Sequence, residues 1–293
     1  MRPQVKGMFW GRRDMVSNSR PVMPSDADAV HWLLERAWRT YLRFPAEDVR
    51  LHLQSGLGWV VDDEHQVSGF MLTEVQPSCA ALITAAAVSD DRQLVPHLDA
   101  LLLRVEETAR QKGASALAQI GYAPWLTAVL DERGFAAQDW VVTYEWQYQP
   151  VSVRGDLSVT VRPAQQRDLA TLLALDGVIF GPVWHKPIGN FEDALARAFT
   201  FTVAEKDGLL IGYQWSDKLQ EHGHITRLAV RPDWENKGVG TRLLTEAMTA
   251  MVKAGIAWIT LNTQESNLRS QALYERHGFR LADQRVAVLW KDL

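Results

Sequence analysis

Residues 228–244, LAVRPDWENKGVGTRLL, decide the fold of this 293-residue chain. The apolar start of this segment is typical of the end of a β-strand, and a polar turn leads from it to Gly238-Val239-Gly240 at the head of an amphipathic helix. The first amide groups of a helix lack intrahelical partners, and glycine lets a ligand approach the backbone closely. The segment therefore predicts a binding site for a pyrophosphate or a similar anionic group.

The composition is that of a globular chain with a sizeable core, because 47% of the residues are hydrophobic and 23% are charged. The formal net charge is −4, and the first 150 residues hold 19 acidic and 14 basic side chains. Residues 151–293 hold 16 acidic and 17 basic side chains. Neither half has the basic surface typical of a nucleic-acid-binding protein, so we expect no nucleic-acid partner.

The chain lacks the sequence signals of membrane insertion and secretion. No apolar run reaches the ~18–20 residues that cross a membrane, and residues 1–20 hold no signal-peptide core. The single cysteine, Cys79, cannot form an internal disulfide, and we expect it to be a buried structural thiol. We therefore expect a cytoplasmic protein without membrane association.

The chain contains one internal repeat. In each copy, a strand and an amphipathic helix are followed by two strands around a turn, a further helix and a Gly-Phe pair. Four landmark pairs recur at separations of 139, 143, 142 and 144 residues: Pro24/Pro163, Gly69/Gly212, Val88/Val230 and Gly134/Gly278. Because the separation is nearly constant, we expect two copies of one mixed α/β domain, residues 1–150 and residues 151–293.

The two copies differ at the positions that would bind the anionic ligand. Pro96 and Leu98 stand in the first copy where the second has the glycines of Gly238-Val239-Gly240. Proline lacks an amide donor, and neither residue lets a phosphate approach as closely as glycine does. Leu130 also stands where the second copy has Tyr274. We therefore expect the first copy to have a structural role, completing an acceptor cleft or the interdomain core.

The second copy resembles the GNAT superfamily of acyl-CoA-dependent N-acyltransferases over most of residues 159–293, and residues 20–148 do so more weakly. The resemblance rests on the loop ENKGVG, residues 235–240, and on NLRSQALYERHGF, residues 267–279. It implies two tandem GNAT-like domains with a mostly antiparallel sheet flanked by helices. Glu235 departs from the Arg or Gln usual in the family, and its carboxylate should repel a pyrophosphate. We expect Lys237 and Arg242 to offset that charge.

The resemblance implies that acetyl-CoA is the co-substrate. It further implies that residues 225–230 splay from the neighbouring strand, so that the backbone groups of Leu228 and Val230 pair with pantetheine. An ordinary central strand is the alternative. The coenzyme-binding residues implied in this way are Leu228, Ala229, Val230, Glu235, Asn236, Lys237, Gly238, Val239, Gly240, Thr241, Asn267 and Tyr274.

The resemblance makes Tyr274 the candidate general acid, since a phenol can donate a proton or a hydrogen bond to the leaving thiolate. The alternative is core packing on an amphipathic helix. The Asn267 amide is expected to hold the pantetheine or a loop carbonyl, and capping of the next helix is an equally good account.

The candidate general base is His224, because an imidazole titrates near neutral pH and arylalkylamine-type members resemble this chain in having a histidine on that strand. Strand alternation predicts that His224 shares a face with Thr226, Leu228 and Val230. A solvated strand-end histidine is the alternative, and Glu265 and His222 are weaker candidates for the base. Asn262 stands where ribosomal-protein-type members have a glutamate base, which argues against their mechanism.

Residues 180–191, FGPVWHKPIGNF, link the first two helices of the second copy and are rich in aromatic residues, proline and glycine. They are expected either to line the acceptor pocket or to cover the core with Trp184 and Phe191. The histidines and acidic residues show no metal-ligand spacing, so we expect no metal. The chain is thus predicted to transfer an acetyl group to a small-molecule amine in a ternary complex. The alternative is a non-catalytic protein that binds or senses acyl-CoA.

Overall fold

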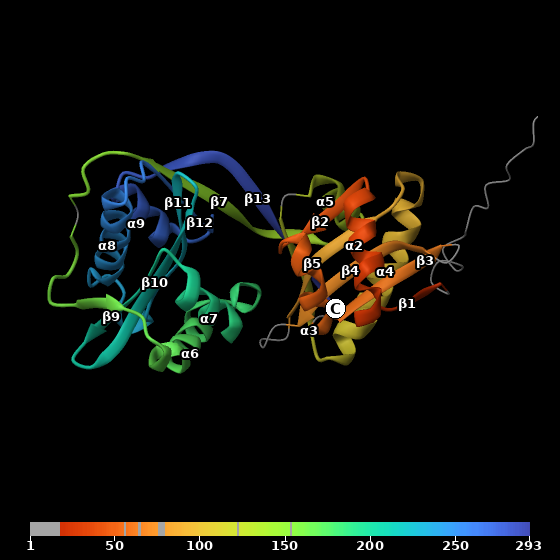
Figure 1. Ribbon diagram of the computed structural model, residues 1–293, viewed down its shortest axis with the longest axis horizontal. Helices are drawn as coiled ribbons and strands as arrows, with labels where there is room; N and C mark the ends of the chain where they lie inside the picture. Colours follow the sequence, from red (N-terminus) through yellow and green to blue (C-terminus); the bar gives the residue numbers. More distant parts are fainter. Residues whose placement is uncertain (1–17, 56, 64–65, 76–79, 122, 153) are drawn as a thin grey trace, which may run out of the picture. The chain divides into compact units, whose positions relative to one another are not determined.

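The computed structural model describes residues 18–55, 57–63, 66–75, 80–121, 123–152 and 154–293 (Figure 1). Cys79 and residues 1–17 lie outside these ranges, so the expectations placed on them are not addressed. The described residues form a mixed α/β structure whose strands pair mostly antiparallel, which confirms the predicted fold class. The chain divides into two compact units, Met1–Gln138 with Ala287–Leu293, and Asp139–Val286.

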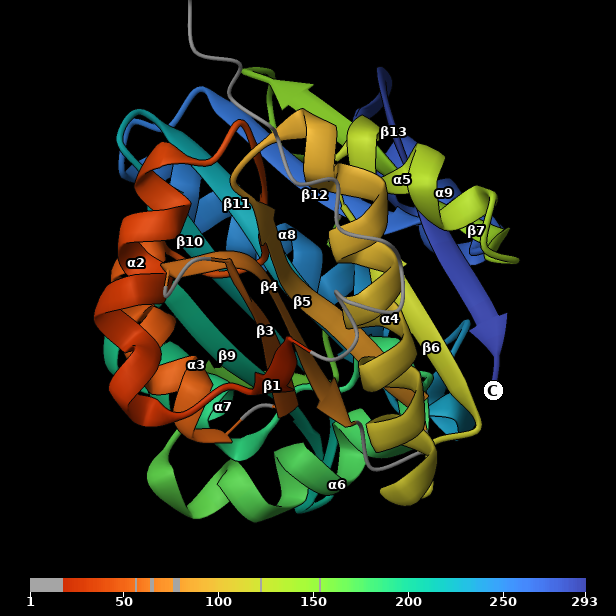
Figure 2. The same cartoon turned by 90° about the vertical axis from the view of Figure 1, so that its right-hand side faces the viewer.

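The sheet of the first unit has the strand order β1-β3-β4-β5-β6 followed by the end of β13. Figure 2 shows α2 and α3 on one side of β3, β4 and β5, and α4 on the other side. Each side buries its own apolar cluster. The elements are β1 (Ser19–Pro21), α2 (Ala27–Arg36), β2 (Arg39–Leu42), α3 (Val49–Ser55), β3 (Leu57–Asp63), β4 (Gln66–Val75), β5 (Ala80–Val88), α4 (Leu94–Gln111), β6 (Ala116–Ile120) and α5 (Pro124–Asp131).

The sheet of the second unit has the order β7-β12-β11-β10-β9-β8. Helices α6 and α7 pack on one face, and α8 and α9 pack on the other. The elements are β7 (Ala136–Gln147), β8 (Thr160–Pro163), α6 (Leu169–Ile179), α7 (Ile188–Arg197), β9 (Thr200–Lys206), β10 (Leu209–Leu219), β11 (His222–Val230), α8 (Val239–Lys253), β12 (Trp258–Gln264), α9 (Leu268–Arg276) and β13 (Arg280–Asp292).

Each unit completes its sheet with a strand from the other half of the sequence. In the second unit, β12 pairs antiparallel with β7, from Trp258 opposite Gln147 to Gln264 opposite Val141. In the first unit, β6 pairs antiparallel with the end of β13. The borders of the compact units therefore fall inside β7 and β13, whereas the sequence repeat predicted a border at residue 150. The division of roles between residues 1–150 and 151–293 stays a prediction.

The repeat is visible in the strand register. The parallel pairs of β5 and β6 run from Ala80–Ala116 to Ile83–Gln119, and those of β11 and β12 run from His222–Trp258 to Ile225–Leu261. Every residue of the second set lies 142 positions after its counterpart in the first. The two units are therefore two copies of one fold, and the corresponding strands pair in the same register within each unit.

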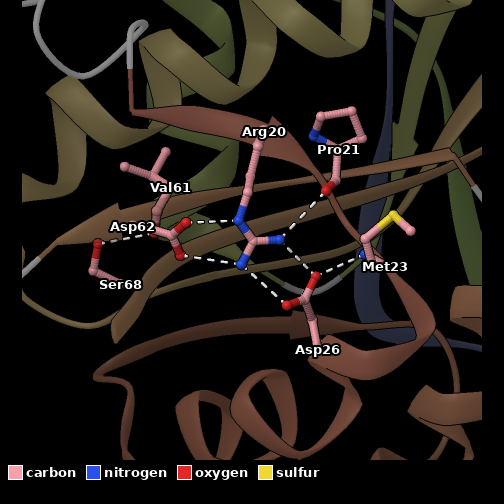
Figure 3. A network of polar contacts seen from close by, with 7 residues as sticks. All are labelled: Arg20, Pro21, Met23, Asp26, Val61, Asp62 and Ser68. Atoms are coloured by element: carbon pink, nitrogen blue, oxygen red, sulfur yellow. Dashed lines mark hydrogen bonds and ion pairs between the residues drawn. The ribbon is translucent and has the colours of Figure 1, made fainter. Parts of the chain in front are cut away.

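An arginine that clamps the first strand also recurs. In the first unit, Arg20 donates to two carboxylates, at 2.7 Å from Nη1 to Asp26 and 2.7 Å from Nε to Asp62 (Figure 3). The same set in the second unit is Arg162, Asp168 and Glu205. This match places Pro21, rather than Pro24, opposite Pro163 and corrects the sequence alignment of the two copies at that point.

Candidate functional site

Strands β11 and β12 separate half-way along their length. Their parallel register ends at Ile225 opposite Leu261, although β11 continues to Val230 and β12 to Gln264. In the part of the chain that the structure describes, no strand pairs with that side of β11 from residue 226 to residue 230. A row of backbone groups on this edge is therefore available to an extended ligand.

A β-bulge at the point of separation contributes to it. The β10–β11 register places Trp215 opposite Arg227 but Ser216 opposite Ile225, which leaves Thr226 as an extra residue. An inserted residue bends a strand and increases its twist. The bulge recurs in the first unit, where Thr84 is the extra residue in β5.

The bulge also makes one sequence prediction wrong. Ile225 and Leu228 both pack in the cluster under α8, whereas Ala229 packs in the cluster under α6 and α7. His224 precedes Ile225 and so lies on the α6–α7 face, opposite to Leu228. Strict alternation predicted a shared face, and the extra residue Thr226 reverses it.

The glycine loop lies immediately beyond β11. Gly238 caps α8 with φ 79°, a left-handed conformation that glycine adopts without steric cost. The first helical bond runs from the Arg242 amide to the Gly238 carbonyl at 2.9 Å. The amides at positions 239, 240 and 241 donate to no backbone carbonyl of the described residues. A Cβ on Gly240 would lie 3.3 Å from the Leu273 side chain, a tight contact that would require that side chain to shift slightly.

Glu235, the residue that departs from the family pattern, is paired. Its carboxylate forms an ion pair with Arg269 in the first turn of α9. Arg269 was not singled out in the sequence because it stands 34 positions after Glu235. The ion pair reduces the repulsion that an unpaired carboxylate would exert on an anionic ligand.

The two basic residues expected to offset Glu235 have other partners. Arg242 pairs with Glu246 at 2.9 Å, one turn along α8. The Lys237 ammonium lies 4.9 Å from the ring centroid of Trp234. The direct ion-pair partner of Glu235 is therefore Arg269, and the expected charge offset by Lys237 and Arg242 stays a prediction.

Tyr274 lies on the same face of the sheet as α8. Its ring is 5.9 Å from that of Tyr144 and 6.1 Å from that of Phe279, and the residue is only 6% exposed. Burial raises the pKa of Tyr274 to about 12, and a hydrogen bond with the Ser270 side chain opposes this. The phenol is therefore protonated at neutral pH. Tyr144 belongs to β7, so the first half of the sequence helps to enclose Tyr274.

His224 lies at the point where β11 and β12 part. Its Nδ1 is 2.8 Å from the Thr260 hydroxyl, and Asp217 stands opposite it on β10. Burial lowers the pKa of His224, the Asp217 carboxylate opposes this, and His222 adds to it. The imidazole is therefore neutral at pH 7 and able to accept a proton.

The sequence profile of the Acetyltransferase (GNAT) family matches residues 169–279, which hold the split strands, the glycine loop and Tyr274. The chain therefore carries a GNAT acetyltransferase domain. This confirms the resemblance read from residues 235–240 and 267–279. The GNAT family uses acetyl-CoA.

Relatives of the GNAT domain include two curated mycothiol acetyltransferases. One, from Acidimicrobium ferrooxidans, is 28% identical over 45% of this chain and 46% of its own length. The other, from Propionibacterium freudenreichii, is 34% identical over 38% of this chain and 40% of its own length. The chain thus spans less than half the length of these relatives in each match.

A solved structure extends the likeness to both units. A tandem GNAT protein from the clavulanic acid biosynthesis pathway superposes with a TM-score of 0.62 at 14% identity, covering 94% of this chain and 98% of that chain. At this identity the match concerns the fold. It agrees with two tandem GNAT-like units in one chain.

The other residues considered for the GNAT site have structural partners. The Glu265 carboxylate pairs with Arg285 at 2.6 Å, and the Asn262 carbonyl oxygen accepts a hydrogen bond from Thr143 at 2.9 Å. The His222 ring lies 5.1 Å from that of Trp258. Asn267 caps α9, because its side-chain oxygen Oδ1 accepts a hydrogen bond from the Ser270 backbone amide at 3.2 Å.

The structure bears on one of the two roles considered for the α6–α7 link, residues 180–191, namely the covering of the core. Phe191 is fully buried and packs 5.3 Å from the ring of Trp215, so it belongs to the core. The backbone of the link is held by side chains of α6 and β11. The Asp176 carboxylate accepts from the Lys186 amide at 3.2 Å, and Arg227 donates to the Trp184 carbonyl at 2.8 Å.

Asp176 and Arg227 form a buried ion pair that sequence reasoning missed. They are 0% and 7% exposed, and Arg227 Nε lies 2.8 Å from the carboxylate. Tyr213 donates its hydroxyl to the same carboxylate, and burial raises the pKa of this phenol well above its ordinary value. The only sequence signal was a carboxylate within the otherwise apolar α6.

No group of three His, Cys, Asp or Glu residues in the described ranges is placed to hold a metal ion. None of the helices described is both long enough and apolar enough to cross a bilayer.

Proposed function

We propose that the chain is an N-acetyltransferase that transfers the acetyl group of acetyl-CoA to an amine of a small molecule in a ternary complex. The observation that carries this proposal is the unpaired edge of β11 leading directly into the glycine loop. An extended amide chain ending in a pyrophosphate requires these two features in this order. The coenzyme-binding half is residues 151–293, and the lone cysteine of the sequence supports a cytoplasmic location.

The residues that hold the coenzyme follow from this order. The backbone groups of Leu228 and Val230 pair with the pantetheine amides, and the amides of Val239, Gly240 and Thr241 bind the pyrophosphate. The Gly238 turn aims these amides, and Arg269 neutralises Glu235 beside them. The bound thioester supplies an activated acyl group.

Tyr274 acts as a hydrogen-bond donor to the departing thiolate. The pKa of a thiol is about 8.5, so its thiolate is a weaker base than a phenolate. Full proton transfer to this thiolate from a phenol with a pKa of about 12 is therefore uphill. A hydrogen bond that strengthens as charge develops on sulfur still lowers the barrier. Tyr274 is thus assigned stabilisation of the leaving group.

His224 acts as the base from the opposite face of the sheet. It lies on the α6–α7 face, whereas Tyr274 lies on the α8–α9 face. Because β11 and β12 part after Ile225 and Leu261, we assign the approach of the amine to the His224 side and the departure of the thiolate to the Tyr274 side. Thr260 holds Nδ1 of the imidazole, and proton uptake is assigned to Nε2.

A small-molecule amine is the acceptor class that we propose, supported by the two mycothiol acetyltransferase relatives. The second candidate is a non-catalytic protein that binds acyl-CoA. Tight packing of Tyr274 among Tyr144 and Phe279 favours this candidate, because a packed tyrosine needs no chemical role.

The test is a screen of primary amines with acetyl-CoA and detection of the released thiol, together with calorimetric binding of acetyl-CoA. Thiol release that depends on the amine, with acetylated product seen by mass spectrometry, supports the transferase. Tight acetyl-CoA binding without amine-dependent release across amino sugars, polyamines, amino acids and aminoacyl amides supports the binding protein. Absence of acetyl-CoA binding contradicts both.

A further inference from the structure

We call the free edge of β11 at residues 226–230 the coenzyme slot. In the first unit, the corresponding edge of β5 is covered by another strand of the chain, β2. β5 and β6 part after Ile83 and Gln119, at the register where β11 and β12 part. From there β2 takes over the edge of β5, pairing antiparallel from Leu42 opposite Ala85 to Arg39 opposite Val88 (Figure 1). The transfer from β6 to β2 leaves no gap, because the Arg43 amide donates to the Thr84 carbonyl at 3.0 Å.

Side chains fix β2 in this position. Tyr41 is 5% exposed, and its hydroxyl donates to the carbonyl of Ile120, the last residue of β6. A Cβ on Gly121 would lie 2.5 Å from the Tyr41 ring, so the turn after β6 is shaped around that ring. Trp125 donates to the Thr40 carbonyl at 3.3 Å. β2 thus forms, on β5, the strand-edge pairing that we assign to pantetheine on β11.

β2 is part of the link between the first two helices, α2 and α3. In the second unit the corresponding link joins α6 and α7 and does not reach β11 as a strand. It is held instead by the buried ion pair. Asp176 binds the Lys186 amide, Arg227 binds the Trp184 carbonyl, and the Arg227 guanidinium lies 3.4 Å from the centroid of the Phe180 ring.

The residues that hold this link are absent from the first unit. By the register of the two sheets, Ala85 corresponds to Arg227 and Phe70 corresponds to Tyr213. By the match of Asp26 with Asp168, Leu34 of α2 corresponds to Asp176 of α6. In the first unit, where these three positions are apolar, the α2–α3 link pairs with the strand edge. In the second unit, where they are Asp176, Tyr213 and Arg227, the α6–α7 link is bound by the ion pair and the strand edge is free.

We propose that the buried Asp176–Arg227 pair is a tether that keeps the α6–α7 link off the free edge of β11 and thereby keeps the coenzyme slot open. The backbone groups of such a link need partners, and an open strand edge offers them. The tether satisfies two of these groups elsewhere and anchors them to a charge pair that is costly to separate. The inference rests on the proposed function only in naming acetyl-CoA as the ligand that the link would exclude.

The test replaces three residues of the second unit with the residue types that stand at the corresponding positions of the first unit. The variant Asp176→Leu, Tyr213→Phe, Arg227→Ala removes both charges and the hydroxyl together, so no buried charge is left unpaired. We expect amide hydrogen exchange at residues 226–230, measured without coenzyme, to slow at least tenfold as the link pairs with β11. We also expect the Kd for acetyl-CoA to rise at least tenfold.

The matched control is Arg162→Ala with Asp168→Ala, which breaks a charge pair in the same unit that does not contact the link. Its exchange at residues 226–230 should remain that of the unaltered protein. A triple variant that is folded by circular dichroism but keeps both its exchange at 226–230 and its acetyl-CoA affinity overturns the tether. Failure of the unaltered protein to bind acetyl-CoA refutes the proposed function, while the coenzyme-free exchange still tests the tether.

The unaltered protein provides a second measurement that does not depend on folding of the variant. Acetyl-CoA should slow exchange at residues 226–230 and leave residues 39–42 and 85–88 unchanged, because β2 already covers the edge of β5. Faster exchange at residues 180–187 on addition of acetyl-CoA would mean that the link moves with the ligand. That result contradicts a fixed tether.

Discussion

Glu235 in the glycine loop forms an ion pair with Arg269 at the start of α9. The pair joins the loop to the helix that carries Tyr274, so one contact connects the expected pyrophosphate site to the expected acid. It also explains how an acidic residue is accommodated where an anionic ligand is expected.

We expect Arg269→Ala to weaken acetyl-CoA binding by about three- to tenfold, in line with the ~1 kcal/mol typical of a partly exposed charge interaction. The cause is the carboxylate left unpaired beside the pyrophosphate. Calorimetry of the double variant Glu235→Gln, Arg269→Ala checks this, because removal of the carboxylate should restore most of the affinity. Equal losses in the single and double variants would refute the role given to Arg269.

We expect Tyr274→Phe to lower kcat by about 10²-fold, the lower range for loss of a hydrogen-bond donor to a developing charge, with a Kd for acetyl-CoA that stays within about twofold. Phenylalanine keeps the packing against Tyr144 and Phe279, so the fold should be retained. Steady-state kinetics and calorimetry on the same preparation separate the two effects. An unchanged kcat would leave Tyr274 as a packing residue.

We expect the acidic limb of the kcat/KM profile to have its midpoint below about 6.5, the ordinary pKa of histidine, because burial lowers the pKa of His224. The neutral imidazole is the active form, so activity rises with pH through this midpoint. His224→Gln should remove the limb and lower kcat. A limb that persists in this variant would assign it to another group.

Acid should destabilise the fold below about pH 6.5, because burial lowers the pKa of His97, His224 and His277. In this range the unfolded chain binds protons that the folded chain does not, so the free energy of unfolding falls as the pH falls. Thermal unfolding between pH 8 and pH 5 measures the effect. A Tm that stays constant over this range would contradict it.

We expect one acetyl-CoA per chain, bound to the second unit. In the first unit α4 begins at Leu94, and β2 covers the edge of β5. Calorimetry with acetyl-CoA gives the stoichiometry, and Pro96→Gly should leave it at one because β2 remains in place. Two equivalent sites would contradict two conclusions about the first unit: that it lacks the glycine loop, and that β2 blocks the edge of β5.

Several features of the site were predictable from local residue patterns. Gly238 is needed where the backbone turns left-handed, and the helix that follows has an apolar face with Leu243 and Leu244 buried. The near-constant repeat spacing predicted two copies of one fold, and their registers differ by 142 residues throughout β5–β6 and β11–β12. Such patterns are local or periodic, so they can be read without a tertiary structure.

Other features depended on contacts that no local pattern records. The face of His224 depends on the bulge at Thr226, because one inserted residue reverses every side chain beyond it. The ion pair of Asp176 and Arg227 joins residues 51 positions apart, and its members look unremarkable within their own elements.

By itself, the sequence determined a repeated α/β chain with a glycine loop in its second copy, because helix periodicity and glycine conformation are local properties. The tertiary structure decided which strand edge is open. β2 closes the edge of β5, whereas Asp176 and Arg227 hold the α6–α7 link away from β11. The difference depends on whether the backbone groups of a link form hydrogen bonds with a strand edge or with a buried charge pair. These partners lie far from the link in the sequence, so only the folded chain places them beside it.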